Sequence, residues 1–308
     1  MFGLWVPLTV AAAALQTLRT AQQKRLTGII GQNGAHFARY FYGAPLAALL
    51  IAALAAGGHD LPRPGTDFVL FGLMGGIAQI IATGCLIHAY TLRNFAVATV
   101  FSKTETIQAA LLSLAVLGEG LSGGGWLAIA VGFAGLLLLT TSGAKGGAIP
   151  LSRAWREPAT LYGLASGLFF ALSGIGIRAA ALSLPESDSS GHGSDFIRAA
   201  VTLAAITAMQ TVLMGTILLL RDRRALARAL GRARGAAASV GVMSVVGSLG
   251  WFLAMTLEPV AHVRALAQIE IIFTLAMTVF VFRERPSARD YGGAALIIVS
   301  VVILLLAR

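Results

Sequence analysis

The chain has 308 residues, of which 57% are hydrophobic and only 12% are charged, and its formal net charge is +10. A soluble domain is usually about 45–50% apolar and about 25% charged, so this composition excludes a soluble enzyme and a disordered chain. The apolar residues form long blocks, which predicts a polytopic helical membrane protein. The single cysteine, Cys85, excludes an internal disulfide.

A helix of about 20 residues crosses a bilayer core of about 30 Å, and ten apolar windows of that length follow one another along the chain. The connections between them are too short to fold into a soluble domain. The predicted spans are, in chain order, Gly3–Gln22, Gly34–Ala56, Asp67–Ala89, Phe95–Leu117, Gly123–Ser142, Thr160–Leu182, Asp195–Leu220, Ala236–Thr256, Val260–Phe282 and Ala288–Ala307.

The last two spans of each half carry related polar residues in the same order. When Glu105 is placed on Glu270, three further positions match: Lys103 with Gln268, Glu119 with Glu284, and Trp126 with Tyr291. A second alignment, offset by one insertion, matches Arg19, Phe37 and Arg39 with Arg178, Phe196 and Arg198. Matches in chain order along both halves indicate an internal repeat, with its copies in residues 1–145 and 156–308.

Five spans per repeat is an odd number, so the second copy must enter the membrane in the direction opposite to the first. The sequence therefore predicts an all-α integral membrane protein with ten transmembrane helices, arranged as two inverted five-helix repeats around a central cavity. Such repeats are related by a pseudo-two-fold axis in the membrane plane and are typical of secondary transporters.

Lys and Arg residues are distributed asymmetrically among the connections. The odd-numbered connections hold nearly all of them, including the arginines between Arg221 and Arg234, whereas the even-numbered connections and the tail hold only Arg63 and Arg308. Positive residues favour the cytoplasmic side. We therefore expect a multi-pass protein of the bacterial inner membrane with odd loops in the cytoplasm and both termini outside. Topology accounts for the positive charge, so no nucleic-acid partner is expected.

Ionisable residues lie within two of the predicted spans, with Glu105 and Glu270 near mid-depth. A charge at the bilayer centre costs about 2.5–3.5 kcal/mol on insertion scales, so such groups should face water, pair or stay neutral. Lys103 and Glu105 point about 200° apart on a helix and cannot pair with each other. Two interpretations remain open. Lys103, Glu105, Arg264, Gln268 and Glu270 line a path for substrate and protons, or tight ion pairs hold helices together without titrating.

Arginines and aromatic residues near the span ends are further candidates. Arg39 and Arg198 either hold a carboxylate or phosphate of a substrate by bidentate contacts or, like Arg178, extend to lipid headgroups. Tyr90 and Trp251 either stack on a planar or cationic substrate or anchor and pack the helices.

The two halves also end alike. Each closes with a turn that contains a glutamate and with a last apolar helix: Leu117-Gly118-Glu119 before Trp126–Leu139, and Phe282-Arg283-Glu284 before Tyr291–Leu306. With the Arg39-Tyr40-Phe41 entry to the second span, this pattern resembles the EamA-type transporters of the drug/metabolite transporter (DMT) superfamily over nearly the whole chain. The resemblance implies a secondary transporter, usually an exporter of small organic metabolites, with a central cavity between the halves. Members commonly keep both termini in the cytoplasm, and the charge bias here departs from that pattern.

These observations favour a secondary active transporter, a proton-coupled exporter of a small organic metabolite such as an amino acid, which works by alternating access. Efflux of multiple drugs or lipophilic cations is the main alternative, and a membrane-embedded enzyme or lipid-handling protein is a third. The sequence has no P-loop or His-Glu-x-x-His helix, and no catalytic residue, metal or cofactor is expected. The expected partners are the solute, protons and membrane lipids, for a monomer or a homodimer.

Overall fold

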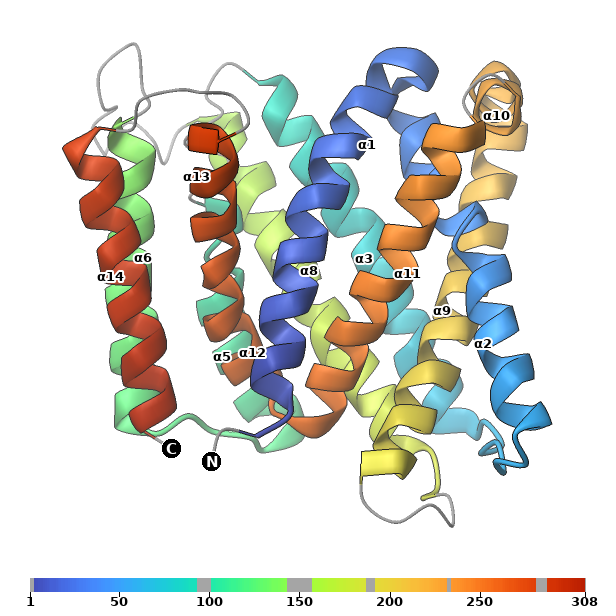
Figure 1. Ribbon diagram of the computed structural model, residues 1–308, viewed down its shortest axis with the longest axis horizontal. Helices are drawn as coiled ribbons and strands as arrows, with labels where there is room; N and C mark the ends of the chain where they lie inside the picture. Colours follow the sequence, from blue (N-terminus) through green and yellow to red (C-terminus); the bar gives the residue numbers. More distant parts are fainter. Residues whose placement is uncertain are drawn as a thin grey trace. The chain divides into compact units, whose positions relative to one another are not determined.

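The structure is a computed structural model that describes residues 3–92, 101–142, 157–186, 192–231, 234–280 and 287–307. All regular secondary structure in these residues is helical, as the composition predicts. The helices (Figure 1) are α1 (Trp5–Phe41), α2 (Ala44–Ala56), α3 (Thr66–Thr91), α5 (Glu105–Leu117), α6 (Gly123–Ser142), α8 (Pro158–Ser183), α9 (His192–Arg221), α10 (Arg223–Leu230), α11 (Arg234–Leu257), α12 (Val260–Leu266), the 3-10 helix η1 (Ala267–Ile269), α13 (Glu270–Phe280) and α14 (Ala288–Leu306).

The chain forms two compact units, and each takes segments from both halves of the sequence. Unit 1 comprises Met1–Val6, Ile77–Ile175 and Glu258–Arg308, and unit 2 comprises Pro7–Gly76 and Gly176–Leu257. Helices α3 and α8 contribute residues to both units. A compact unit is therefore not the same segment of chain as a sequence repeat.

Most predicted spans coincide with observed helices to within three residues, notably α3, α6, α8, α9, α11 and α14. Within the described ranges, six helices are long and apolar enough to cross a membrane, and two shorter apolar helices cover Glu105–Leu117 and Gly123–Leu139. Few charges over so many apolar helices make this a multi-pass membrane protein. The count of ten spans stays a prediction.

The first predicted connection is shorter than expected, because helical residues continue beyond Gln22 and the two helices that make up α1 meet at a kink at Gly31. The residues of that connection include Gln22–Arg25, all of which have good helix propensity, so no residue stops the helix there. The helical geometry is interrupted only at Gly31, whose φ of 79° is readily adopted by glycine. The second predicted span is in turn divided at Gly43, where a β-carbon would lie 2.9 Å from the Arg39 carbonyl oxygen.

The predicted connection between the seventh and eighth spans contains a short helix, α10, that was not predicted. Arg, Ala and Leu make up this segment and all three favour helix. Asp222 caps the helix, because its carboxylate accepts a hydrogen bond from the Ala225 N–H at 2.9 Å.

Glycines allow close helix packing within each unit. In unit 1, α6 and α14 lie side by side (Figure 1), and a β-carbon at Gly135 would lie 2.7 Å from the Gly293 carbonyl oxygen. In unit 2, a β-carbon at Gly176 of α8 would lie 2.7 Å from the Cα of Gly75 in α3. Small residues at such crossings let helix backbones approach each other in membranes.

We predict that Gly135→Ala lowers the free energy of unfolding by about 1–3 kcal/mol, because the new methyl group overpacks the α6–α14 contact. The matched control is Gly84→Ala in α3, where a β-carbon would meet nothing within 4 Å. That control should be neutral or stabilise by up to about 1 kcal/mol. Unfolding of the purified variants in detergent measures both, and equal effects of the two substitutions would contradict the packing described here.

Candidate functional site

Two predicted spans of unit 1 are broken at the residues that the repeat alignment places on each other. Residues 103 and 104 form a turn, and α5 begins at Glu105. The ninth predicted span is α12, the 3-10 turn Ala267–Ile269, and then α13, which begins at Glu270. Each glutamate is thus the first residue of a helix. The N-terminus of a helix carries partial positive charge and favours a carboxylate.

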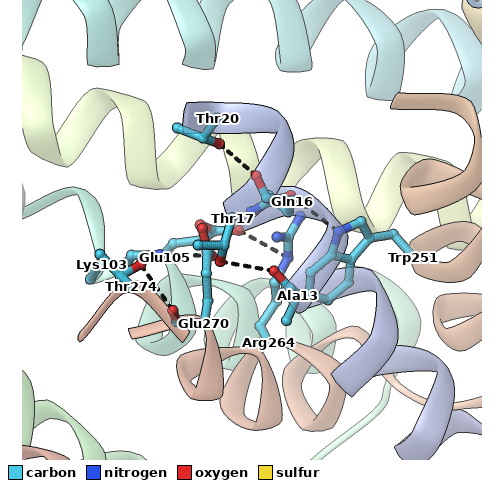
Figure 2. A network of polar contacts seen from close by, with 10 residues as sticks. All are labelled: Ala13, Gln16, Thr17, Thr20, Lys103, Glu105, Trp251, Arg264, Glu270 and Thr274. Carbon is cyan, nitrogen blue, oxygen red and sulfur yellow. Dashed lines mark hydrogen bonds and ion pairs between the residues drawn. The ribbon is translucent and has the colours of Figure 1, made fainter. Parts of the chain in front are cut away.

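The two glutamates form ion pairs that cross between the repeats. Arg264 Nε lies 2.9 Å from Glu105 Oε1, and Lys103 Nζ lies 3.4 Å from Glu270 Oε2 (Figure 2). Lys103 therefore pairs with the glutamate of the other repeat. The site, which we call the crossed-pair cluster, has two carboxylates and two cations and no formal net charge.

These four side chains are partly shielded from solvent. The side chains of Glu105 and Arg264 are 12% and 15% exposed, and those of Glu270 and Lys103 are 18% and 31% exposed. Removing one partner of a buried pair strands the other charge and typically costs about 3–5 kcal/mol. The cluster is therefore stable when both charges of each pair stay compensated, whether by each other or by a ligand.

Neighbouring helices hold the first break in place. A β-carbon at Gly167 of α8 would lie 3.0 Å from the Ser102 carbonyl oxygen and 3.1 Å from the Glu105 nitrogen, so the absent side chain lets α8 approach the start of α5. Gln108 Nε2 donates to Thr104 Oγ1 at 3.0 Å. Gly167 and Gln108 were not predicted as site residues. For Gly167 the reason is that only the fold brings α8 to this turn.

Gln268, which aligns with Lys103, lies in the second break and is 8% exposed. A β-carbon at Gly132 of α6 would clash with the Gln268 side-chain oxygen and would lie 2.9 Å from Ser300 Oγ of α14. Gln268, which is part of the 3-10 turn before Glu270, thus packs between α6 and α14.

A second polar network lies within unit 2. Trp251 Nε1 donates to Gln16 Oε1 at 3.1 Å, and Thr20 Oγ1 donates to the Gln16 carbonyl oxygen at 2.8 Å (Figure 2). Trp251 is 8% exposed. The indole therefore packs with its N–H satisfied. Tyr90, the other aromatic candidate, lies in the last turn of α3, and its side chain is not among those that the structure describes.

The arginines of unit 2 are engaged with the protein in different ways. Arg198 Nη1 lies 3.5 Å from Glu186 Oε1 and 3.9 Å from Asp195 Oδ1. The Arg39 guanidinium carbon lies 5.3 Å from the centre of the Tyr40 ring. Arg178 donates to the carbonyl oxygens of Met255 and Thr256, at 2.6 Å and 3.1 Å. Arg178 therefore caps the end of α11 and does not extend to headgroups.

Two polar contacts of unit 1 were not predicted from the sequence. His262 Nδ1 lies 2.7 Å from Glu258 Oε1, with the two side chains 16% and 5% exposed. The spacing of four residues could have indicated this pair, since it brings side chains together on a helix. Glu258, however, precedes Pro259 at the end of a predicted span, where a shared helix was not expected.

Ser122 lies in the stretch Gly120–Gly124, which has the Gly-x-Ser-x-Gly spacing of a nucleophile elbow. Here Ser122 Oγ accepts from the Gly125 N–H at 3.1 Å and so caps α6.

Glu119 and Glu284 are the two glutamates that the sequence places in the turns before the last helix of each half. Ser113 Oγ donates to Glu119 Oε2 at 3.3 Å, so Glu119 binds back to the end of α5. Glu284 and the turn around it lie outside the described residues.

Comparison with known proteins identifies the family of the chain. No curated protein matches it, whereas 29 chains of known structure do. One of them, described as "Crystal structure of protein", covers 99% of this chain and 96% of its own, with a TM-score of 0.71 and 18% sequence identity, which shows a shared fold. The sequence model of the EamA-like transporter family matches twice, over residues 3–141 and 157–306. The chain therefore belongs to the EamA-like transporter family, and it is a DMT-type membrane transporter.

Proposed function

We propose that the protein is a secondary active transporter that exports a small zwitterionic metabolite, such as an amino acid, in exchange for protons. The crossed-pair cluster is the observation that supports this proposal most directly. Ionisable groups inside membrane spans are costly and mark substrate or proton paths. Broken helices that meet near the middle of the membrane supply such binding sites in transporters.

The cluster holds the charges that a zwitterion requires. Arg264 and Lys103 can bind a carboxylate, and Glu105 and Glu270 can bind an ammonium group. A zwitterion that inserts between the pairs replaces the internal partner of each charge with one of its own, so that no ion is left uncompensated. A purely cationic solute would leave Arg264 and Lys103 without counterions, which argues against the alternative of lipophilic-cation efflux.

Protons can compete with the solute at the same carboxylates. A proton on Glu105 removes the charge that holds Arg264, and a proton on Glu270 does the same for Lys103. Proton binding and ammonium binding to one carboxylate are mutually exclusive. Two ligands that exclude each other at one site are coupled by thermodynamic linkage, which is what exchange of a solute for protons requires.

Alternating access would use the two repeats, residues 1–145 and 156–308, as inverted halves around a central cavity. The double match of the family model supports two related halves. Asymmetric loop charge supports an inner-membrane orientation with both termini outside. From the sequence, Gln268, Arg39, Tyr90, Arg198 and Trp251 stay proposed as candidates for substrate contact.

We predict that zwitterionic amino acids raise the unfolding temperature of the purified protein more than matched amines or carboxylic acids do. A ligand at 100 times its Kd stabilises by about 2.7 kcal/mol. Glu105→Gln should lose this response, because a neutral amide cannot compensate the charge of the ammonium group. Glu119→Gln, a carboxylate in the α5–α6 turn, is the matched control and should keep it. An amine that stabilises as well as the zwitterion, in both variants, would contradict the proposed substrate class.

We also predict that a pH gradient drives accumulation of the identified solute in proteoliposomes. The double variant Glu105→Gln/Glu270→Gln should lose the response to the gradient, because no carboxylate remains in the cluster to exchange a proton. The helical circular-dichroism signal of the reconstituted variant separates loss of coupling from loss of folding. Gradient-driven accumulation that persists in the double variant would show that the proton binds elsewhere.

A further inference from the structure

Helix α10 is a feature that the transport proposal does not use. It lies between α9 and α11, both of which are long and apolar enough to span a membrane. α9 ends at Arg221 and α11 begins at Arg234. The connection is short, so α10 must lie where these two spans leave the bilayer.

One face of α10 is fixed against the rest of unit 2. Ala225 and Ala229 are 2% and 0% exposed. The Tyr42 hydroxyl donates to the Ala229 carbonyl oxygen at 3.2 Å. A β-carbon at Gly34 of α1 would lie 3.4 Å from the Ala225 carbonyl oxygen, so glycine permits this contact. With its N-terminus capped by Asp222, the helix is held in a defined orientation.

Arginines cover the other side of α10 and both of its ends. Within residues 221–231, the only carboxylate is that of Asp222, which is used as the helix cap. Four of the described arginines are exposed and the last is half-buried: Arg221, Arg223, Arg224, Arg234 and Arg228. This set, which we call the arginine ledge, is a fixed surface of one sign of charge.

Exposed leucines adjoin the ledge. Leu219 and Leu220 at the end of α9 are 49% and 74% exposed, and Leu230 at the end of α10 is 36% exposed. A ligand that satisfies both features must carry a negative headgroup and an apolar chain. A nucleic acid or a free phosphate would match the arginines but would leave the leucines uncovered.

We propose that the arginine ledge binds the phosphate headgroups of anionic phospholipids, whose acyl chains lie along Leu219, Leu220 and Leu230. Basic residues beside a membrane span are attracted to anionic lipid surfaces, and guanidinium groups bind phosphate in a bidentate manner. The fixed helix presents the arginines together, so little ordering is needed on binding. This proposal does not depend on the solute that is transported.

The test uses the purified full chain in nanodiscs of phosphatidylcholine with increasing shares of phosphatidylglycerol. The unfolding temperature should rise with the phosphatidylglycerol share, and added salt should weaken the rise. In Arg221→Gln/Arg224→Gln, the apparent affinity for phosphatidylglycerol should fall by about fivefold per arginine removed. These two arginines are chosen because Arg223 and Arg234 also bond to the Leu219 and Leu230 carbonyl oxygens.

The matched control is Arg63→Gln/Arg289→Gln, which removes the same charge from two exposed arginines outside the ledge. It should respond to phosphatidylglycerol like the wild type. Equal loss in both double variants, or no difference between the two lipids, would overturn the proposal. If glycerol 3-phosphate stabilises the protein as much as phosphatidylglycerol does, the ledge is a site for soluble anions and the lipid proposal is also overturned.

Discussion

Exchange of partners between two ion pairs is the interaction on which the proposed mechanism depends. Glu105 with Arg264, and Glu270 with Lys103, place two opposite charges from each repeat beside those of the other. Separating either pair inside a membrane strands a charge at a cost of several kcal/mol. Each ion pair can separate only if a ligand supplies the opposite charge or if a proton neutralises the carboxylate. A zwitterion does the first and a proton does the second.

The backbone makes this arrangement possible. Both glutamates begin helices immediately after a break, so that the partial positive charge of each helix end supports the carboxylate. A continuous helix would keep Lys103 and Glu105 on opposite sides of one cylinder. Gly167 lets α8 pack against the first break, and Gln268 in the second break packs against α6 at Gly132. Local irregularity is thus supported by packing that belongs to other helices.

Sequence reasoning predicted what depends on local composition and missed what depends on tertiary contact. Apolar windows located most helices, because span length is set by the membrane. The cost of a buried charge identified Glu105, Glu270 and Lys103 as residues in need of partners. The crossing of the pairs could not be predicted, since neither Gly nor Pro marks the breaks at 103–104 and 267–269. Helix α10 was missed because its arginines were interpreted only as a topology signal.

The most direct test of the crossed pairs is a double-mutant cycle of Glu105→Gln with Arg264→Gln, with unfolding free energy as the measured quantity. If the two side chains pair, each single variant strands a charge and the double variant does not, so the coupling energy should be about 1–3 kcal/mol. The cycle of Glu119→Gln with Arg264→Gln should be additive to within about 0.5 kcal/mol. Additivity in the first cycle as well would contradict the pairing and, with it, the exchange of partners proposed here.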